Sequence, residues 1–310
     1  MTWVRPEESS CHAVCHWPLN FGLSCTARHC SVGQHVCHIP VDRKTILAFA
    51  ARRNDTHRMA NSATKIRLYV EESLSTGTEL CLDRGQAHYL TRVMRQVIGD
   101  WVLLFNGQDG EWLSRIINVN KNECYLAVES MTRPQTEEPQ VCLVFAPIKK
   151  ARLDFMVEKA TELGASRLQP IVTKHTDVSR INTDRLAATV REAAEQCERL
   201  SVPTINFPSS FEEFLDGWDT IQPLMYMDET GYGKPMHATA DGLAGGFIEV
   251  GLLVGPEGGF ATSELDQLRN LPFSMPVTLG PRVLRAETAA LTALSIWQSL
   301  HGDGCEARIR

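Results

Sequence analysis

The stretch LLVGPEGGF, residues 252–260, sets a proline, an acid and three glycines directly after an apolar run. The overlapping segment GFIEVGLLV (246–254) is apolar and β-branched, as is typical of a central strand. Glycine lets the backbone turn without a Cβ penalty, and TSELDQLRN (262–270) has the pattern of a following helix. This order of strand, turn and helix predicts a ligand site of backbone N–H groups at the edge of an α/β sheet.

The composition is typical of a globular protein. Of the 310 residues 43% are hydrophobic and 22% charged, and the length is enough for two domains with cores. A formal net charge of −6 argues against a protein that coats nucleic acid indiscriminately, although a local basic face could bind one site. The sequence has neither a secretory signal nor a long apolar run, so we expect a cytoplasmic protein without a membrane anchor.

Residues 1–64 differ from the rest, because they are rich in Cys, His and Arg and lack periodicity. We expect an extension that is disordered or that results from a mis-assigned start, with Met59 as a second candidate start; a transit peptide is the alternative. Four of its residues roughly fit the spacing of a zinc finger: Cys11, Cys15, His29 and His35. A segment so dense in both residue types produces such matches by chance, so we predict no metal site.

Residues 65–137 are expected to form a small β-barrel, because short alternating segments such as IRLYV, WVLLFNG and CYLAVESM recur in them. Between these segments QAHYLTRVMRQ predicts a helix with His88, Arg92 and Arg95 on one face. This face could contact RNA phosphates, or it could be an ordinary solvated basic surface. The stretch RPQTEEPQ (133–140) has the prolines and charges of a linker.

Residues 138–303 alternate strand and helix patterns, with 304–310 as a tail. The helical segments include KKARLDFMVEKATELG (149–164), a segment capped by Thr183, and a final helix from about Arg285 to Leu300. Apolar strand patterns lie between them. The alternation predicts an α/β fold with a mostly parallel sheet covered by helices.

Two glycine turns, GPEGGF (255–260) and LGPRVLRAETA (279–289), each connect a predicted strand to a predicted helix. Adjacent parallel strands would bring both turns to one edge of the sheet. Together with EKATELG (158–164) and EAAEQCERL (192–200), they resemble the motifs of the small-subunit ribosomal RNA uridine-N3 methyltransferases of the SPOUT class.

The resemblance covers residues 66 to about 302, including the HYLTRVMR segment. It implies a SPOUT-type sheet with a trefoil knot, preceded by a PUA-like barrel, in a homodimer that binds S-adenosylmethionine. It further implies methylation of N3 of uridine 1498, in the family's numbering, in 16S ribosomal RNA within the 30S subunit. The segment KHTDVSR (174–180) departs from the arginine–serine pairing of the family, which leaves the role of that loop open.

Transferred residue by residue, the resemblance implies ten cofactor-binding positions: Leu253, Gly255, Pro256, Glu257, Gly258, Gly259, Leu279, Gly280, Leu284 and Ala286. It implies RNA contacts by four residues: His88, Arg92, Arg95 and Arg199.

The reaction itself suggests roles for polar residues. Loss of the N3 proton spreads negative charge onto the uracil carbonyl oxygens, and a guanidinium is suited to stabilise that charge. Arg285 is the leading catalytic candidate, followed by Arg282 and Arg199. Glu287 could accept the proton, although its place in the first turn of a helix equally suits capping.

Three alternatives stay open from the sequence. The substrate could be tRNA or 23S ribosomal RNA, because the barrel does not discriminate among RNAs. The protein could be a non-catalytic RNA-binding assembly factor, although the intact GPEGG and LRAETA segments argue against it. The turn after residue 254 could bind a nucleotide phosphate, but neither GxGxxG nor a P-loop lysine occurs there.

Overall fold

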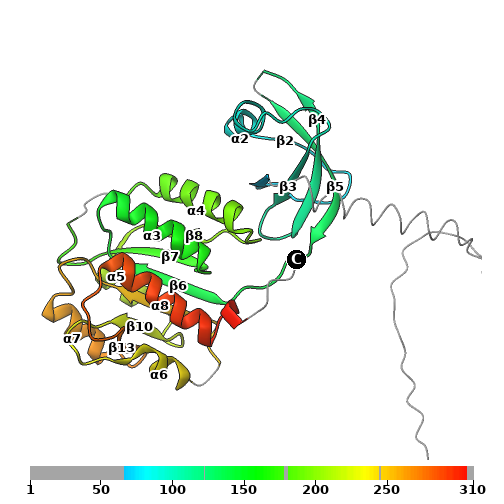
Figure 1. Cartoon of the computed structure of the whole chain (residues 1–310). Coiled ribbons are helices and arrows are strands. Elements are labelled where there is room, and N and C mark those ends of the chain that lie inside the picture. The colour runs from blue at the N-terminus through cyan, green and yellow to red at the C-terminus, as the bar shows by residue number, and fades with distance from the viewer. Residues whose placement is uncertain (1–65, 122, 178–180, 244–245, 306–310) are drawn as a thin grey trace, which may run out of the picture. The chain divides into compact units, whose positions relative to one another are not determined.

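The computed structural model describes residues 66–121, 123–177, 181–243 and 246–305 (Figure 1). The expected extension over residues 1–64, with its zinc-finger-like spacing, lies outside these ranges. Most of the expected tail, 304–310, lies outside them as well.

The first part of the described chain is a five-stranded sheet in the order β1-β3-β4-β5-β2. Its strands are β1 (Arg67–Tyr69), β2 (Glu79–Cys81), β3 (Trp101–Phe105), β4 (Glu111–Val119) and β5 (Cys124–Arg133). β1 pairs with β3 in parallel, and the other pairs are antiparallel. Alternate residues such as Val102, Leu104 and Leu126 are buried in its own core, as the sequence pattern predicted. Strands β1 and β2 form the two edges of this sheet.

A short helical segment follows β2. Helix α2 (Arg84–His88) begins where the Asp83 carboxylate accepts the N–H groups of Gly85 at 2.6 Å and Gln86 at 2.9 Å. The chain then continues as a π-helix, η1 (Tyr89–Val93), and Arg95 has a left-handed backbone with φ 56°. The predicted α-helical face of His88, Arg92 and Arg95 is therefore wrong for Arg95, because the wider turn and the left-handed residue end the regular spacing.

The second part is a parallel sheet in the order β11-β13-β10-β12-β6-β7-β8, with β9 paired to β7 (Figure 1). Its strands are β6 (Gln140–Phe145), β7 (Arg167–Val172), β8 (Thr204–Ile205), β9 (Ser209–Ser210), β10 (Leu224–Met227), β11 (Lys234–Pro235), β12 (Glu249–Val254) and β13 (Ser274–Thr278). Its helices are α3 (Lys150–Glu162), α4 (Thr183–Cys197), α5 (Phe211–Gly217), α6 (Met236–Asp241), α7 (Thr262–Asn270) and α8 (Ala286–Leu300), and the 3-10 turn η2 (Asp303–Cys305) follows α8.

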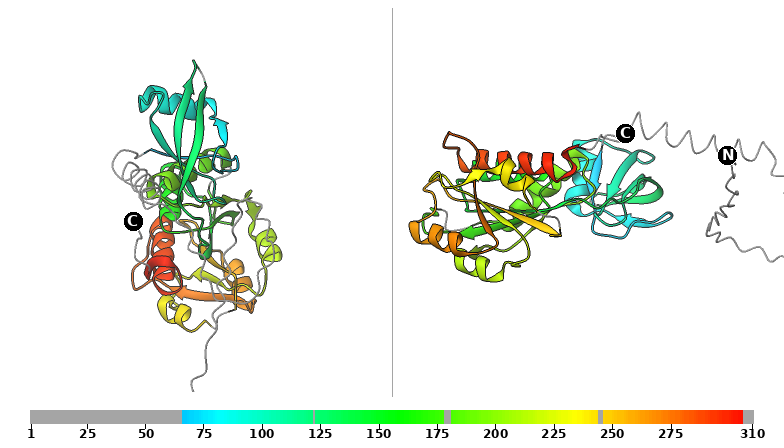
Figure 2. Two further views of the ribbon diagram at one scale, coloured as in Figure 1. Left: turned by 90° about the vertical axis from the view of Figure 1, so that its right-hand side faces the viewer. Right: turned by 90° about the horizontal axis from the view of Figure 1, so that it is seen from below.

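Helices cover both faces of this sheet. Helices α3, α4, α6 and α8 share one apolar core with the sheet, and α5 and α7 share a core with its other face. Figures 1 and 2 show α3 and α8 side by side on the first of these faces. The sequence pattern of α3 predicts one apolar stripe of Leu153, Met156, Val157, Ala160 and Leu163. The first four are buried, because residues three or four apart lie on one helix face, and Leu163 at the C-cap is partly buried against the same core. The predicted cap of α4 moves by one residue, since the Asn182 side chain, rather than that of Thr183, accepts the N–H of Arg185.

The two sheets are joined by contacts of Arg67. Its Nε donates to Glu111 Oε2 at 2.7 Å, and its Nη atoms donate to the carbonyls of Ala194 at 2.9 Å, Glu195 at 3.0 Å and Arg199 at 2.8 Å. These carbonyls lie at the end of α4, where helix geometry leaves them without an intrahelical partner and where the helix dipole favours a cation. Arg67 in the first sheet therefore caps a helix of the second.

Glu111 is the acidic partner of Arg67 in a buried ion pair. Arg133 also donates to it, at 2.7 Å, and the side chains of Arg67 and Glu111 are only 4% and 6% exposed. Burial raises the pKa of Glu111, but the hydrogen bonds and charges of Arg133 and Arg67 outweigh burial and hold that pKa below its usual range. Because the pKa is lower in the fold than in the unfolded chain, the stabilisation is full at neutral pH and is lost as the pH falls through the folded pKa.

Replacing Arg67 by Met should lower the free energy of unfolding by about 3 kcal/mol, because Glu111 loses a buried partner. The matched control is Arg115→Met, which removes a solvent-exposed pair with Glu129 at 2.8 Å and should cost less than about 1 kcal/mol. Urea denaturation of both variants at pH 7 measures the difference. Equal losses in the two variants would show that the buried contacts of Arg67 contribute nothing beyond a surface pair.

Candidate functional site

Three connections of the second sheet meet around one cavity of about 470 Å³. They follow β10, β12 and β13, and they contribute lining residues from the segments 227–231, 254–259 and 277–289. These strands are neighbours in the order β13-β10-β12 and run in parallel, so their carboxyl ends share one edge. This edge is where open parallel sheets bind ligands.

The structure brings together most of the residues expected to bind a cofactor. Eight of the ten line the cavity: Gly255, Pro256, Glu257, Gly259, Leu279, Gly280, Leu284 and Ala286. Leu253 instead lies inside β12 with its side chain in the core shared with α5 and α7. Gly258 is exposed, and a Cβ on it would approach the Cβ of His175 at 3.1 Å.

The connection after β10 was not predicted to belong to the site. This segment lines the cavity with Met227, Asp228, Glu229 and Gly231, although MDETG contains no motif that distinguishes it from an ordinary turn. Only the strand order, which places β10 between β12 and β13, makes it part of the site.

Three glycines in the cavity wall have positive φ angles, 89° at Gly231, 69° at Gly259 and 117° at Gly280. Side-chain-bearing residues rarely adopt this conformation. A Cβ on Gly259 would also meet the carboxylate of the exposed Glu229 where it now lies, so the β10 and β12 connections are in close contact here.

Arg152, on α3, lies between acids of two connections. Its Nη1 is 3.9 Å from Glu257 Oε1 in the β12 connection, and its Nε is 3.7 Å from Glu287 Oε1 in the first turn of α8. The Glu287 side chain is 12% exposed, and within the described residues its Oε2 is buried without a hydrogen-bond partner. Arg152 thus counterbalances two carboxylates beside the cavity, and Glu287 keeps one acceptor oxygen uncommitted.

Arg282 and Arg285 both line the cavity and are exposed. Arg285 occupies the N-cap position of α8 with an extended backbone, and its side chain makes no capping bond. The α8 terminus fixes the backbone of Arg285 at the cavity rim, two residues before Glu287.

The segment KHTDVSR (174–180), whose role was left open from the sequence, contacts the β12 connection and the start of α7. Lys174 donates its N–H to Glu264 at 2.8 Å and its Nζ to Ser263 at 2.7 Å. His175 Nδ1 lies 3.1 Å from the carbonyl oxygen of Gly259. Residues 178–180 of this segment lie outside the described ranges.

The four expected RNA contacts fall in two different environments. His88, Arg92 and Arg95 are exposed on the first sheet's helical segment, beside exposed Val93 and Val97.

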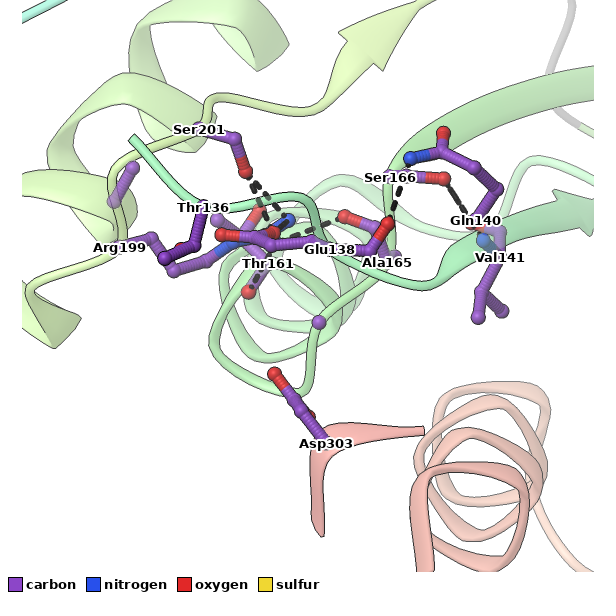
Figure 3. Close-up of polar contacts among 12 residues, drawn as sticks. Thr136, Glu138, Gln140, Val141, Thr161, Ala165, Ser166, Arg199, Ser201 and Asp303 are labelled. Carbon is purple, nitrogen blue, oxygen red and sulfur yellow. Dashed lines mark hydrogen bonds and ion pairs between the residues drawn. The ribbon is translucent and has the colours of Figure 1, made fainter. Parts of the chain in front are cut away.

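Arg199 is instead internal, with a side chain 9% exposed (Figure 3). Its Nη1 donates to the carbonyls of Thr161 at 2.7 Å and Ala165 at 2.8 Å, and its Nη2 pairs with Glu138. Contact between this guanidinium and RNA would require breaking these bonds, so Arg199 holds the chain around the end of α3.

In the described part of the chain, no group of three or more His, Cys, Asp or Glu side chains could hold a metal ion. None of the helices in that part is long and apolar enough to cross a membrane.

Comparison with known proteins identifies families for both parts. Residues 136–298 match the RNA methyltransferase domain family, and residues 82–129 match the RNA methyltransferase PUA domain family. The ribosomal RNA small subunit methyltransferase E of Rickettsia conorii is 31% identical over 244 residues, which cover 77% of this chain and 97% of that protein.

Two solved structures extend the likeness to the fold. The ribosomal RNA small subunit methyltransferase E of Neisseria gonorrhoeae, solved with S-adenosylmethionine, is 28% identical with a TM-score of 0.69, over 77% of this chain and 99% of that one. A Legionella pneumophila protein solved with the same cofactor is 29% identical, also with a TM-score of 0.69, over 77% and 98%.

These matches confirm the predicted fold class, a SPOUT-type α/β sheet preceded by a small PUA-like sheet domain. The cavity lies in the part that matches the methyltransferase domain, and the exposed His88 and Arg92 lie in the part that matches the PUA domain. The chain belongs to the ribosomal RNA small subunit methyltransferase E family of S-adenosylmethionine-dependent RNA methyltransferases.

Proposed function

We propose that this protein transfers a methyl group from S-adenosylmethionine to N3 of one uridine of 16S ribosomal RNA in the small subunit, uridine 1498 in the family's numbering. The observation that carries the proposal is the convergence of three parallel-strand connections, two of them rich in glycine, on one cavity. The names of the relatives support the substrate, and the cofactor in two of the solved structures supports the methyl donor.

The cavity suits S-adenosylmethionine in size and chemistry. About 470 Å³ is within the usual range for sites of small ligands and cofactors. Backbone at Gly255 and Gly280 offers close approach, and Leu279 and Leu284 offer apolar surface. The carboxylate of Glu257 adds negative charge suited to a cationic ligand. We assign cofactor contact to the ten positions expected from the sequence, with Leu253 and Gly258 acting through the backbone.

When bound, the cofactor supplies a methyl group that is already activated by its sulfonium. The chain must then align the uracil N3 and assist loss of its proton. We assign Arg285 to the negative charge that spreads onto the flanking carbonyl oxygens, because its guanidinium is exposed at the cavity rim. Glu287 is the candidate acceptor of the N3 proton: its Oε2 has no hydrogen-bond partner in the described chain, and this buried oxygen must turn toward the cavity to reach the base.

The remaining assignments concern the assembly. We propose that His88, Arg92 and Arg95 of the domain over residues 65–137 contact the RNA backbone, and that residues 138–303 carry the reaction. A homodimer follows from the resemblance, and exposed Phe155 and Val283 offer apolar surface for it. A ribosomal substrate would place the protein in the cytoplasm.

The proposal is tested by transfer of labelled methyl to unmethylated 30S subunits, 50S subunits and tRNA, with mapping of the modified base. We expect label on one uridine N3 of 16S ribosomal RNA in the 30S sample alone. Label on tRNA or 23S ribosomal RNA would select the alternative substrate. Absence of label in all three samples, with S-adenosylmethionine still bound, would favour a non-catalytic assembly factor.

Arg285→Ala should reduce turnover by about 100-fold, because removal of one preorganised charge-stabilising donor typically costs that much. The dissociation constant of S-adenosylmethionine should change by less than about threefold, since the guanidinium acts on the base. Arg282→Ala is the matched control, a neighbouring exposed arginine of the same cavity, and should cost turnover less than about tenfold. Single-turnover kinetics and calorimetry measure both quantities. Loss of cofactor binding in parallel with turnover would contradict the role of Arg285.

A further inference from the structure

Tyr232 is an exposed aromatic residue beside the cavity. It follows Gly231, which lines the cavity, and 77% of Tyr232 is exposed. The chain on its other side is anchored, because Gly233 passes so close to Val277 of β13 that a Cβ would lie 2.6 Å from the Val277 carbonyl carbon. Tyr232 therefore follows a cavity-lining residue and precedes backbone that is packed tightly against β13.

One face of this ring is covered by Arg269 of α7, whose guanidinium carbon lies 4.9 Å from the ring centroid. A guanidinium over an aromatic face is an attractive arrangement. Since most of Tyr232 is exposed, the opposite face of the ring is open to solvent.

The Arg269 side chain is positioned by polar contacts with three residues. It lies 3.8 Å from the carboxylate of Asp228, whose side chain is fully buried, 3.4 Å from Asp266 and 3.3 Å from the hydroxyl of Thr230. Asp228 Oδ1 in turn accepts the backbone N–H of Thr230 at 2.8 Å. These contacts position the Arg269 guanidinium against the Tyr232 ring, so the two side chains form one preorganised surface.

Such a surface suits the substrate of the proposed reaction. A Watson–Crick pair would occupy N3, so methyl transfer needs a uridine that is unpaired, and unstacking a base costs energy. RNA-binding proteins commonly recover such energy by stacking unpaired bases on aromatic side chains and on arginine.

We infer that Tyr232, backed by Arg269, is a stacking site for an unpaired nucleobase of the RNA substrate at the rim of the methyl-transfer site. The inference rests on the proposed function. The ligand is the flat face of a base, which the target uracil or its neighbour in the strand can supply. Tyr232 acts in substrate binding and takes no part in proton transfer.

The test compares Tyr232→Ala with Tyr232→Phe, which keeps the ring. The matched control is Phe207→Ala, which removes another exposed aromatic that does not line this cavity. Loss of one stacked base costs about 1–3 kcal/mol, so Tyr232→Ala should raise KM for 30S subunits at least fivefold. Tyr232→Phe and Phe207→Ala should stay within about twofold of the parent, and all variants should bind S-adenosylmethionine equally in calorimetry.

A second readout separates this inference from the proposed function. Binding of a fluorescein-labelled, unpaired RNA strand of about ten uridines is measured in the presence of cofactor and without methyl transfer. Selective weakening in Tyr232→Ala would support the stacking site even if 30S subunits are not methylated. Unchanged RNA binding in that variant would overturn it. Weakened cofactor binding would also overturn it, because the ring would then serve the adenine of S-adenosylmethionine.

Discussion

The site depends on one constraint, the strand order β13-β10-β12 in a parallel sheet. In parallel pairing the connections that follow the three strands leave at the same edge, although β10 and β13 are separated in the chain by β11, α6, β12 and α7. Two of these connections contain Gly259 and Gly280, whose positive φ angles are rarely adopted by residues with side chains. The cavity therefore follows from the topology of the sheet, and its wall includes turns that favour glycine.

Arginines hold this arrangement together at three junctions. Arg67 caps α4 from the first sheet, Arg199 binds the carbonyls at the end of α3, and Arg152 lies between the acids beside the cavity. Each cation meets carbonyl or carboxylate oxygens that would otherwise be costly to bury. Because the chain carries a net charge of −6, we expect contacts with RNA to be confined to local basic sites.

Local pattern was sufficient to predict much of this structure. The apolar stripe of α3, the limits of α7 and the two glycine turns were readable because each depends on residues close in sequence. The role of Arg152 was not readable, because its partners Glu257 and Glu287 lie more than 100 residues away in the chain. Arg199 was expected to contact RNA because of its position in a motif. That position could not reveal that tertiary packing buries its side chain.

Hydrogen–deuterium exchange of the full chain with and without S-adenosylmethionine tests, without any substitution, whether the connections after β10, β12 and β13 form the cofactor site. We expect slower exchange of backbone amides in residues 228–231, 255–259 and 279–286, with little change in residues 84–98. Unchanged exchange in all three connections at saturating cofactor, or protection confined to another part of the chain, would contradict this expectation.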